Sequence, residues 1–161
     1  MKNNNESLHK KIGELIRCGK NDEVLRVLAL NKSSVDISAY LLVKKGIVIL
    51  LTECGRYSID DAFDYFQKAI LVDPDYLPAH IESGWFLLNI KNEPLEALEY
   101  FSRIIERKDV QMDFYCEAFE GFLSCVIELE GKKKANIYCE NNIYLPEDSK
   151  IEIWNKLNLV Y

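Results

Sequence analysis

The chain is 161 residues long; 48% of its residues are hydrophobic, 29% are charged and only four are proline. This balance is typical of one folded globular domain and excludes a disordered or low-complexity chain. The formal net charge of −6 argues against nucleic acid as a partner, because nucleic-acid-binding domains usually carry a basic face.

The N-terminal segment and the apolar runs predict the cellular compartment, and the compartment in turn predicts the state of the cysteines. Residues 1–7 are polar and lack the apolar stretch of a secretory signal peptide. The longest apolar run, residues 46–51, is too short to cross a bilayer. We therefore expect a cytoplasmic protein without membrane contact. In that reducing compartment the five cysteines, which are irregularly spaced and form no Cys-x-x-Cys pair, are expected to be buried apolar residues rather than disulfide or zinc partners.

Two short helices are predicted at the N-terminus, over residues 5–18 and 21–31, with Gly19 and Lys20 as the turn between them. Together they form an N-terminal helix pair over residues 5–31. We expect this pair to cap the helix pairs that follow, because an array of repeats must cover the apolar faces at its ends.

Three longer helix pairs are predicted over residues 38–74, 77–108 and 113–146. The second helix of each pair carries a small residue, a bulky residue four positions later and a third member three positions beyond, all on one face. In the first two pairs these residues are Ala62, Phe66 and Ala69, then Ala97, Phe101 and Ile104. A weaker third copy consists of Ala135, Cys139 and Asn142.

The first helix of each pair contains a glycine within an apolar stretch, at Gly46, Gly84 and Gly121. A glycine inside a helix costs roughly 1 kcal/mol relative to alanine, so it usually has a packing reason. We expect that reason to be close approach of the paired helix. The turns within the three pairs are predicted at Gly55, Asn92 and Gly131.

Several helix starts are marked by capping residues. Ser58 and Asp61 have the spacing of a capping box. Residues 92–94, Asn-Glu-Pro, combine a capping residue with a proline start. Pro146, followed by two acidic residues, predicts the start of a final amphipathic capping helix over residues 147–161.

The helix pairs, their glycines and the Ala-x-x-x-aromatic pattern resemble the tetratricopeptide repeat family. The first repeat, 38–74, matches best, whereas the second lacks the closing proline and the third has Pro146 one residue out of register. The resemblance covers about two thirds of the chain. It implies an all-α fold in which stacked antiparallel helix pairs form a right-handed superhelix, as a single domain over residues 1–161.

No constellation of residues points to catalysis or to a metal. The two histidines, His9 and His80, lack ligand neighbours at metal-binding spacing. Residues 73–75, Asp-Pro-Asp, lack the further ligands and the glycine of a calcium loop, so a turn is the better interpretation. We therefore predict a protein that is not an enzyme and that needs no cofactor or metal.

In the tetratricopeptide family the leading helix of each repeat lines the concave face. The resemblance assigns nine mostly apolar and aromatic positions to such a partner-binding groove: Tyr40, Val43, Ile47, Ile81, Trp85, Asn89, Tyr115, Ala118 and Phe122. Trp85 stands at the middle repeat, and exposed aromatic residues often mark partner contacts. The alternative is that a one-residue shift of the frame places several of these residues in the core between helices.

Two functional hypotheses remain, and both make this a protein-binding module. In the first, the chain is a small bacterial inhibitor that neutralises one folded partner, as toxin-immunity proteins do; its acidity suits a basic partner. In the second, it resembles a type III secretion translocator chaperone that holds an extended apolar segment. A generic adaptor is the third interpretation, with a second copy of the chain as one partner to consider.

Overall fold

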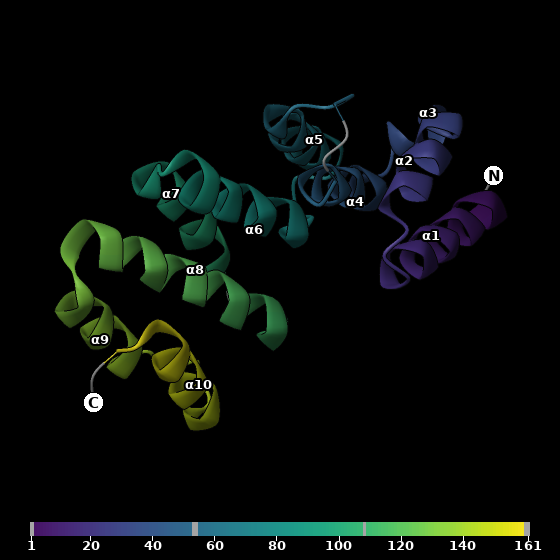
Figure 1. Cartoon of the computed structure of the whole chain (residues 1–161). Coiled ribbons are helices and arrows are strands. Elements are labelled where there is room, and N and C mark those ends of the chain that lie inside the picture. Colours follow the sequence, from purple (N-terminus) through teal and green to yellow (C-terminus); the bar gives the residue numbers. More distant parts are fainter. Residues whose placement is uncertain (1, 53–54, 108, 160–161) are drawn as a thin grey trace. The chain divides into compact units, whose positions relative to one another are not determined.

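The computed structural model describes residues 2–52, 55–107 and 109–159, with side chains described from residue 6 onward. Within these ranges all regular structure is helical, which confirms the predicted all-α fold of antiparallel helix pairs (Figure 1). The described helices are α1 (Lys2–Arg17), α2 (Asn21–Leu30), α3 (Lys32–Val35), α4 (Ala39–Leu50), α5 (Ile59–Val72), α6 (Leu77–Phe86), the π-helical segment η1 (Leu87–Lys91), α7 (Pro94–Ile105), α8 (Met112–Glu130), α9 (Lys132–Glu140) and α10 (Glu147–Leu157).

The chain divides into two compact units, Met1–Glu82 and Ser83–Tyr161, with the boundary inside α6. Each unit has its own buried apolar residues. The N-terminal helices α1 and α2 agree with the pair expected over residues 5–31, but the short helix α3 had no signal in the sequence.

The antiparallel pair of α4 and α5 dominates the first unit. A β-carbon added to Gly46 of α4 would overlap the ring of Phe66 and would lie 2.9 Å from the carbonyl oxygen of Ala62. Ala62, Phe66 and Ala69 of α5 are all fully buried. The glycine therefore permits the close approach of the paired helix, as the sequence predicts.

In the second unit, two glycines on different helices pack against the same aromatic ring. A β-carbon on Gly84 of α6 would lie 2.6 Å from Phe101 Cζ, and one on Gly121 of α8 would overlap the same ring. Phe101 lies on α7 and is fully buried, as is Ala97 on the same helix. Both Gly84 and Gly121 thus pack on one aromatic ring of α7.

The C-terminal part of the second unit is built by α8, α9 and α10 around a shared apolar cluster. Ala135 and Cys139 of α9 are fully buried there, and Trp154 of α10 is 5% exposed. The predicted position of Asn142 on the helix face is wrong. Helix α9 ends at Glu140, so Asn142 lies in the segment that follows the helix. The side-chain oxygen Oδ1 of Asn142 accepts hydrogen bonds from the backbone N–H groups of residues 144 and 145.

The predicted turns and caps are confirmed with one exception. Ser58 and Asp61 form a reciprocal capping box at the start of α5. Pro94 occupies the first turn of α7, but Asn92 does not cap that helix. Asn92 instead ends η1 in the left-handed conformation, with φ of 57°. Its backbone N–H group donates to the carbonyl oxygen of Leu87.

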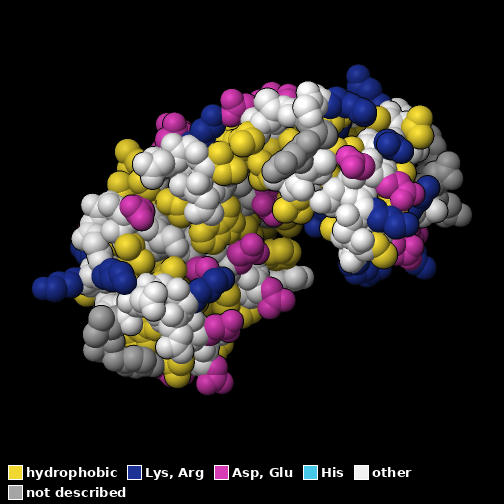
Figure 2. Space-filling view, viewed as in Figure 1, with side chains coloured by type: hydrophobic (Ala, Val, Ile, Leu, Met, Phe, Trp, Pro, Cys, Tyr) yellow, Lys and Arg dark blue, Asp and Glu magenta, His cyan; other side chains and the backbone are white. Residues whose placement is uncertain are grey.

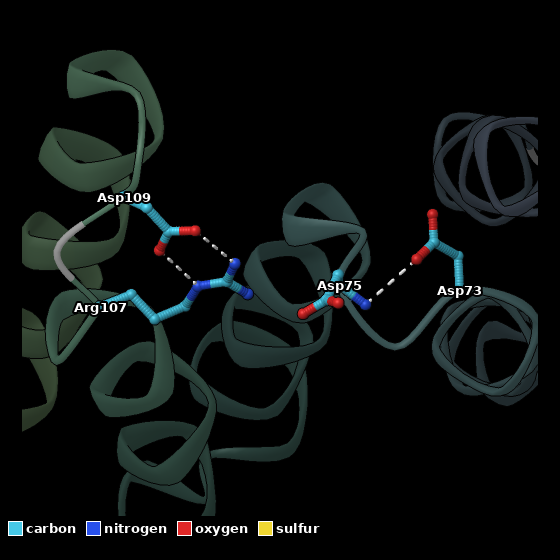
Figure 3. Close-up of polar contacts among 4 residues, drawn as sticks. All are labelled: Asp73, Asp75, Arg107 and Asp109. Carbon is cyan, nitrogen blue, oxygen red and sulfur yellow. Dashed lines mark hydrogen bonds and ion pairs between the residues drawn. The ribbon is translucent and has the colours of Figure 1, made fainter.

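Hydrogen bonds to aspartate side chains stabilise two of the turns between helices (Figure 3). After α5, the Asp73 Oδ1 atom accepts a 3.1 Å hydrogen bond from the backbone N–H of Asp75, so this segment is a turn. After α7, the guanidinium of Arg107 donates two 3.2 Å hydrogen bonds to the carboxylate of Asp109. This bidentate pairing holds the pKa of the Asp109 carboxyl below its usual value.

Candidate partner-binding surface

The nine residues expected to line a groove divide by exposure. Four are less than a tenth exposed: Val43, Ile81, Tyr115 and Ala118. Four others are half-buried: Tyr40, Ile47, Trp85 and Phe122. Only Asn89 is exposed. The four buried residues supply packing within the chain, so the surface on which a partner can be seated is narrower than the sequence indicates.

The first unit offers little of this surface. The Tyr40 ring packs against the His9 ring of α1, with 4.6 Å between centroids, and it lies beneath the ammonium of Lys44 at 5.6 Å. Tyr40 thus helps to join α4 to the N-terminal helix. Ile47 is the other half-buried candidate of this unit.

In the second unit Trp85 and Asn89 come together at a small pocket of about 150 Å³. Leu88, Asn92, Ser124 and Glu128 complete its lining. The Trp85 ring is held by an edge-to-face contact with Phe101, 5.2 Å between centroids, which also fixes its position relative to the helix core. The pocket therefore combines an aromatic wall with amide, hydroxyl and carboxylate groups.

The π-helical segment η1 shapes this pocket. A π-helix inserts an extra residue into each turn, and such segments occur frequently at functional sites. Here it carries Leu88 and Asn89 into the pocket lining, and the left-handed Asn92 that ends it also lines the pocket. Nothing in the sequence pattern distinguishes η1 from a continuation of α6, so the sequence analysis did not predict this segment.

Five aromatic rings form a continuous row along α8 and its neighbours in the second unit. Consecutive centroids lie 6.3, 6.1, 6.0 and 5.3 Å apart. The row runs in the order Tyr144, Tyr115, Phe119, Phe122 and Tyr138. Tyr144 is 59% exposed and Tyr138 is 39% exposed, so the row reaches the surface at both ends.

Acidic side chains gather over α8 and α10 (Figure 2). Glu117, Glu120 and Glu152 line a pocket of about 280 Å³ between these helices, together with Lys156. Lys156 Nζ pairs with Glu120 Oε2 at 2.7 Å. Loss of hydration raises the pKa of Glu117, and the neighbouring Glu120 carboxylate raises it further. This face of the second unit is therefore negatively charged.

The described residues contain neither a cluster of metal ligands nor a helix that could span a membrane. No group of three or more His, Cys, Asp or Glu side chains among them is placed to hold a metal ion. None of the described helices is both long and apolar enough to cross a membrane. The expectation of buried cysteines is confirmed for Cys125 and Cys139, but it is wrong for Cys18, which is exposed, and Cys116 is only half-buried. Cys54 lies outside the described residues.

Comparisons with known proteins add no relative from which a function could be transferred. No protein-family model matches the chain, and no curated protein or solved structure shows significant similarity to it.

Proposed function

We propose that the protein is a non-enzymatic, tetratricopeptide-like binding module that seats a protein partner on its second unit. The observation that carries the proposal is the pocket at Trp85, where an incompletely buried tryptophan meets Asn89 and other polar groups. Tryptophan is the residue type most enriched among interface hot spots, because its large ring is desolvated on binding. A rim of polar groups around an apolar centre is the usual anatomy of such a surface.

The partner that suits this surface best is a basic folded protein. The chain carries a net charge of −6, and the carboxylates of Glu117, Glu120 and Glu152 lie on the second unit. Complementary charge accelerates association and rejects partners of the wrong sign. We therefore favour a small bacterial inhibitor of the toxin-immunity type.

The aromatic row supports a second candidate function. Phe122, Tyr138 and Tyr144 are partly or largely accessible and lie along one connected row. An extended apolar segment of an unfolded client would contact the row at its accessible ends, at Tyr144 and at Phe122 with Tyr138, because the middle rings Tyr115 and Phe119 are buried. Binding of such a segment depends on apolar burial and should respond weakly to salt.

Co-expression with the product of the neighbouring gene tests the inhibitor hypothesis. We expect that product to stop cell growth when expressed alone and the wild-type chain to restore growth. Trp85→Ala should lose the protection, whereas Lys133→Ala, an exposed residue on α9, should retain it. A neighbouring product that is harmless and forms no complex with the chain would refute the inhibitor hypothesis.

A further inference from the structure

The first unit contains a pocket of its own, with a volume of about 270 Å³. It is bounded by α2, α3, α4, α5 and the segment that leads into α5. One part of the lining is apolar: Leu28, Ala29 and Val35. The other part is polar: Lys32, Asp36, Lys45, Tyr57 and Tyr65. A site with an apolar floor and a few convergent polar groups is the usual form of a small-molecule site.

Lys45 of α4 is the central polar group of this pocket. Its Nζ atom donates a 2.6 Å hydrogen bond to the phenol oxygen of Tyr65 and lies 5.4 Å from the centroid of the Tyr57 ring. An ammonium group has three N–H donors, so two remain after the bond to Tyr65. Among the described residues, no carboxylate lies within ion-pair distance of Lys45.

The charge of this pocket is opposite to that of the chain. Lys32 and Lys45 contribute two positive charges to the lining and Asp36 contributes one negative charge, whereas the whole chain carries −6. A third ammonium, that of Lys68, lies 4.9 Å from the Tyr65 ring. The nearby carboxylate of Asp61 is already bonded to Ser58 in the capping box. The pocket therefore favours an anion.

The apolar part of the lining decides which kind of anion fits. Leu28 is 1% exposed and Val35 is 2% exposed, so they close the floor, and the accessible apolar surface comes from Ala29 and the two tyrosine rings. Two tyrosine rings, Tyr57 and Tyr65, form the walls. An inorganic anion would leave this apolar surface unused, whereas an organic acid covers it. The volume lies just below the range of about 300–1,000 Å³ found for drug-sized ligands, so the ligand must be small.

We propose that this pocket binds a small organic monocarboxylate with an aromatic or branched apolar body. The carboxylate accepts hydrogen bonds from the free N–H donors of Lys45, and the body lies against Ala29 and the rings of Tyr57 and Tyr65. This site is independent of the partner-binding surface on the second unit, since all of its lining residues belong to the first unit.

Benzoate is a suitable probe, and benzamide is its neutral counterpart of nearly the same shape. Titration of the full chain, followed by two-dimensional NMR of the backbone amides, should show saturable shifts in α4 and α5 with benzoate. Benzamide should bind at least tenfold more weakly. Equal affinity for the two compounds, or no saturable shift with benzoate at tens of millimolar, would overturn the proposal. This comparison uses the wild-type chain alone and therefore does not depend on any variant folding.

A variant pair tests the role of Lys45. Lys45→Met keeps the length of the side chain but removes the charge, and we expect it to weaken benzoate binding at least tenfold. Lys44→Met is the matched control, because Lys44 is the neighbouring lysine on α4 but does not line the pocket. If Lys45→Met folds and binds benzoate as wild type does, or if Lys44→Met weakens binding equally, the carboxylate is not held by Lys45 and the proposal fails.

Discussion

Gly46, Gly84 and Gly121 are positions where a helix approaches an aromatic ring too closely for a β-carbon to fit. Their recurrence within apolar helical stretches made them recognisable in the sequence, and so did the Phe66 and Phe101 rings that follow. What the sequence did not show is that Phe101 contacts two glycines on different helices, because that contact depends on how three helices pack.

Replacing Gly46 with alanine should lower the free energy of unfolding by about 1–3 kcal/mol, the usual cost of overpacking a core. The added β-carbon would overlap the Phe66 ring and crowd a backbone carbonyl oxygen, neither of which can move cheaply. Gly13→Ala is the matched control, since its β-carbon would lie 3.7 Å from the Tyr40 hydroxyl, an ordinary contact. In urea titrations this control should match or exceed wild type, and equal losses in both variants would contradict the packing account.

The cysteines differ in their expected reactivity, because burial disfavours the thiolate form that reacts. Burial raises the pKa of the Cys125 thiol to about 12 and also raises the pKa of Cys139. In a Cys54→Ser background, a thiol reagent at pH 8 should therefore label exposed Cys18 rapidly and leave Cys125 and Cys139 unlabelled until the chain unfolds. Rapid labelling of Cys125 in the native protein would show that α8 is packed differently.

Local signals in the sequence located most helix starts, because a cap depends on a few adjacent residues. The capping box at Ser58 and the proline in the first turn of α7 are examples. Asn92 shows the limit of such reasoning. Asparagine suits both a helix N-cap and a left-handed C-cap, and the π-helical segment before it decided in favour of the C-cap.

The capping box should make the stability of α5 sensitive to acid. Hydrogen bonds from the Ser58 backbone and side chain hold the pKa of Asp61 below its usual value. A carboxyl group whose pKa is lower in the folded state stabilises the fold at pH values above its pKa in the unfolded chain, which is about 3.9. This contribution is lost as the pH falls through the pKa of the folded state. The difference in unfolding free energy between wild type and Asp61→Asn should therefore be largest at pH 6 and should decrease below about pH 4. A difference that does not change with pH would show that the ionised carboxylate is not the stabilising group.

Across the whole molecule, the sequence predicted the fold class better than the binding surface. Helical periodicity and glycine spacing are properties of short segments, but the exposure of a residue such as Val43 or Tyr115 depends on neighbours from several helices. Both residues are buried, although the sequence assigned them to the concave face of the helix array. Trp85 and Asn89 reach a pocket whose other wall comes from α8, a contact between helices distant in sequence.

The charge of the whole chain leads to a kinetic prediction. If the partner is a basic folded protein, its association rate with this acidic chain should fall as salt rises from about 50 to 500 mM, because salt screens the attraction between them. Stopped-flow mixing would measure this rate. A rate that is insensitive to salt would instead favour capture of an extended apolar segment at the accessible aromatic residues Phe122, Tyr138 and Tyr144.

Calorimetric titration of the purified partner into wild type, Trp85→Ala and Asn89→Ala, with a melting curve for each, tests the proposed binding surface most directly. Asn89 is exposed, so its replacement should leave stability unchanged while weakening binding to a smaller extent. Trp85→Ala should weaken binding by about 2 kcal/mol or more, as loss of a hot-spot tryptophan does. Wild-type affinity in both variants would place the partner elsewhere on the chain and contradict the account.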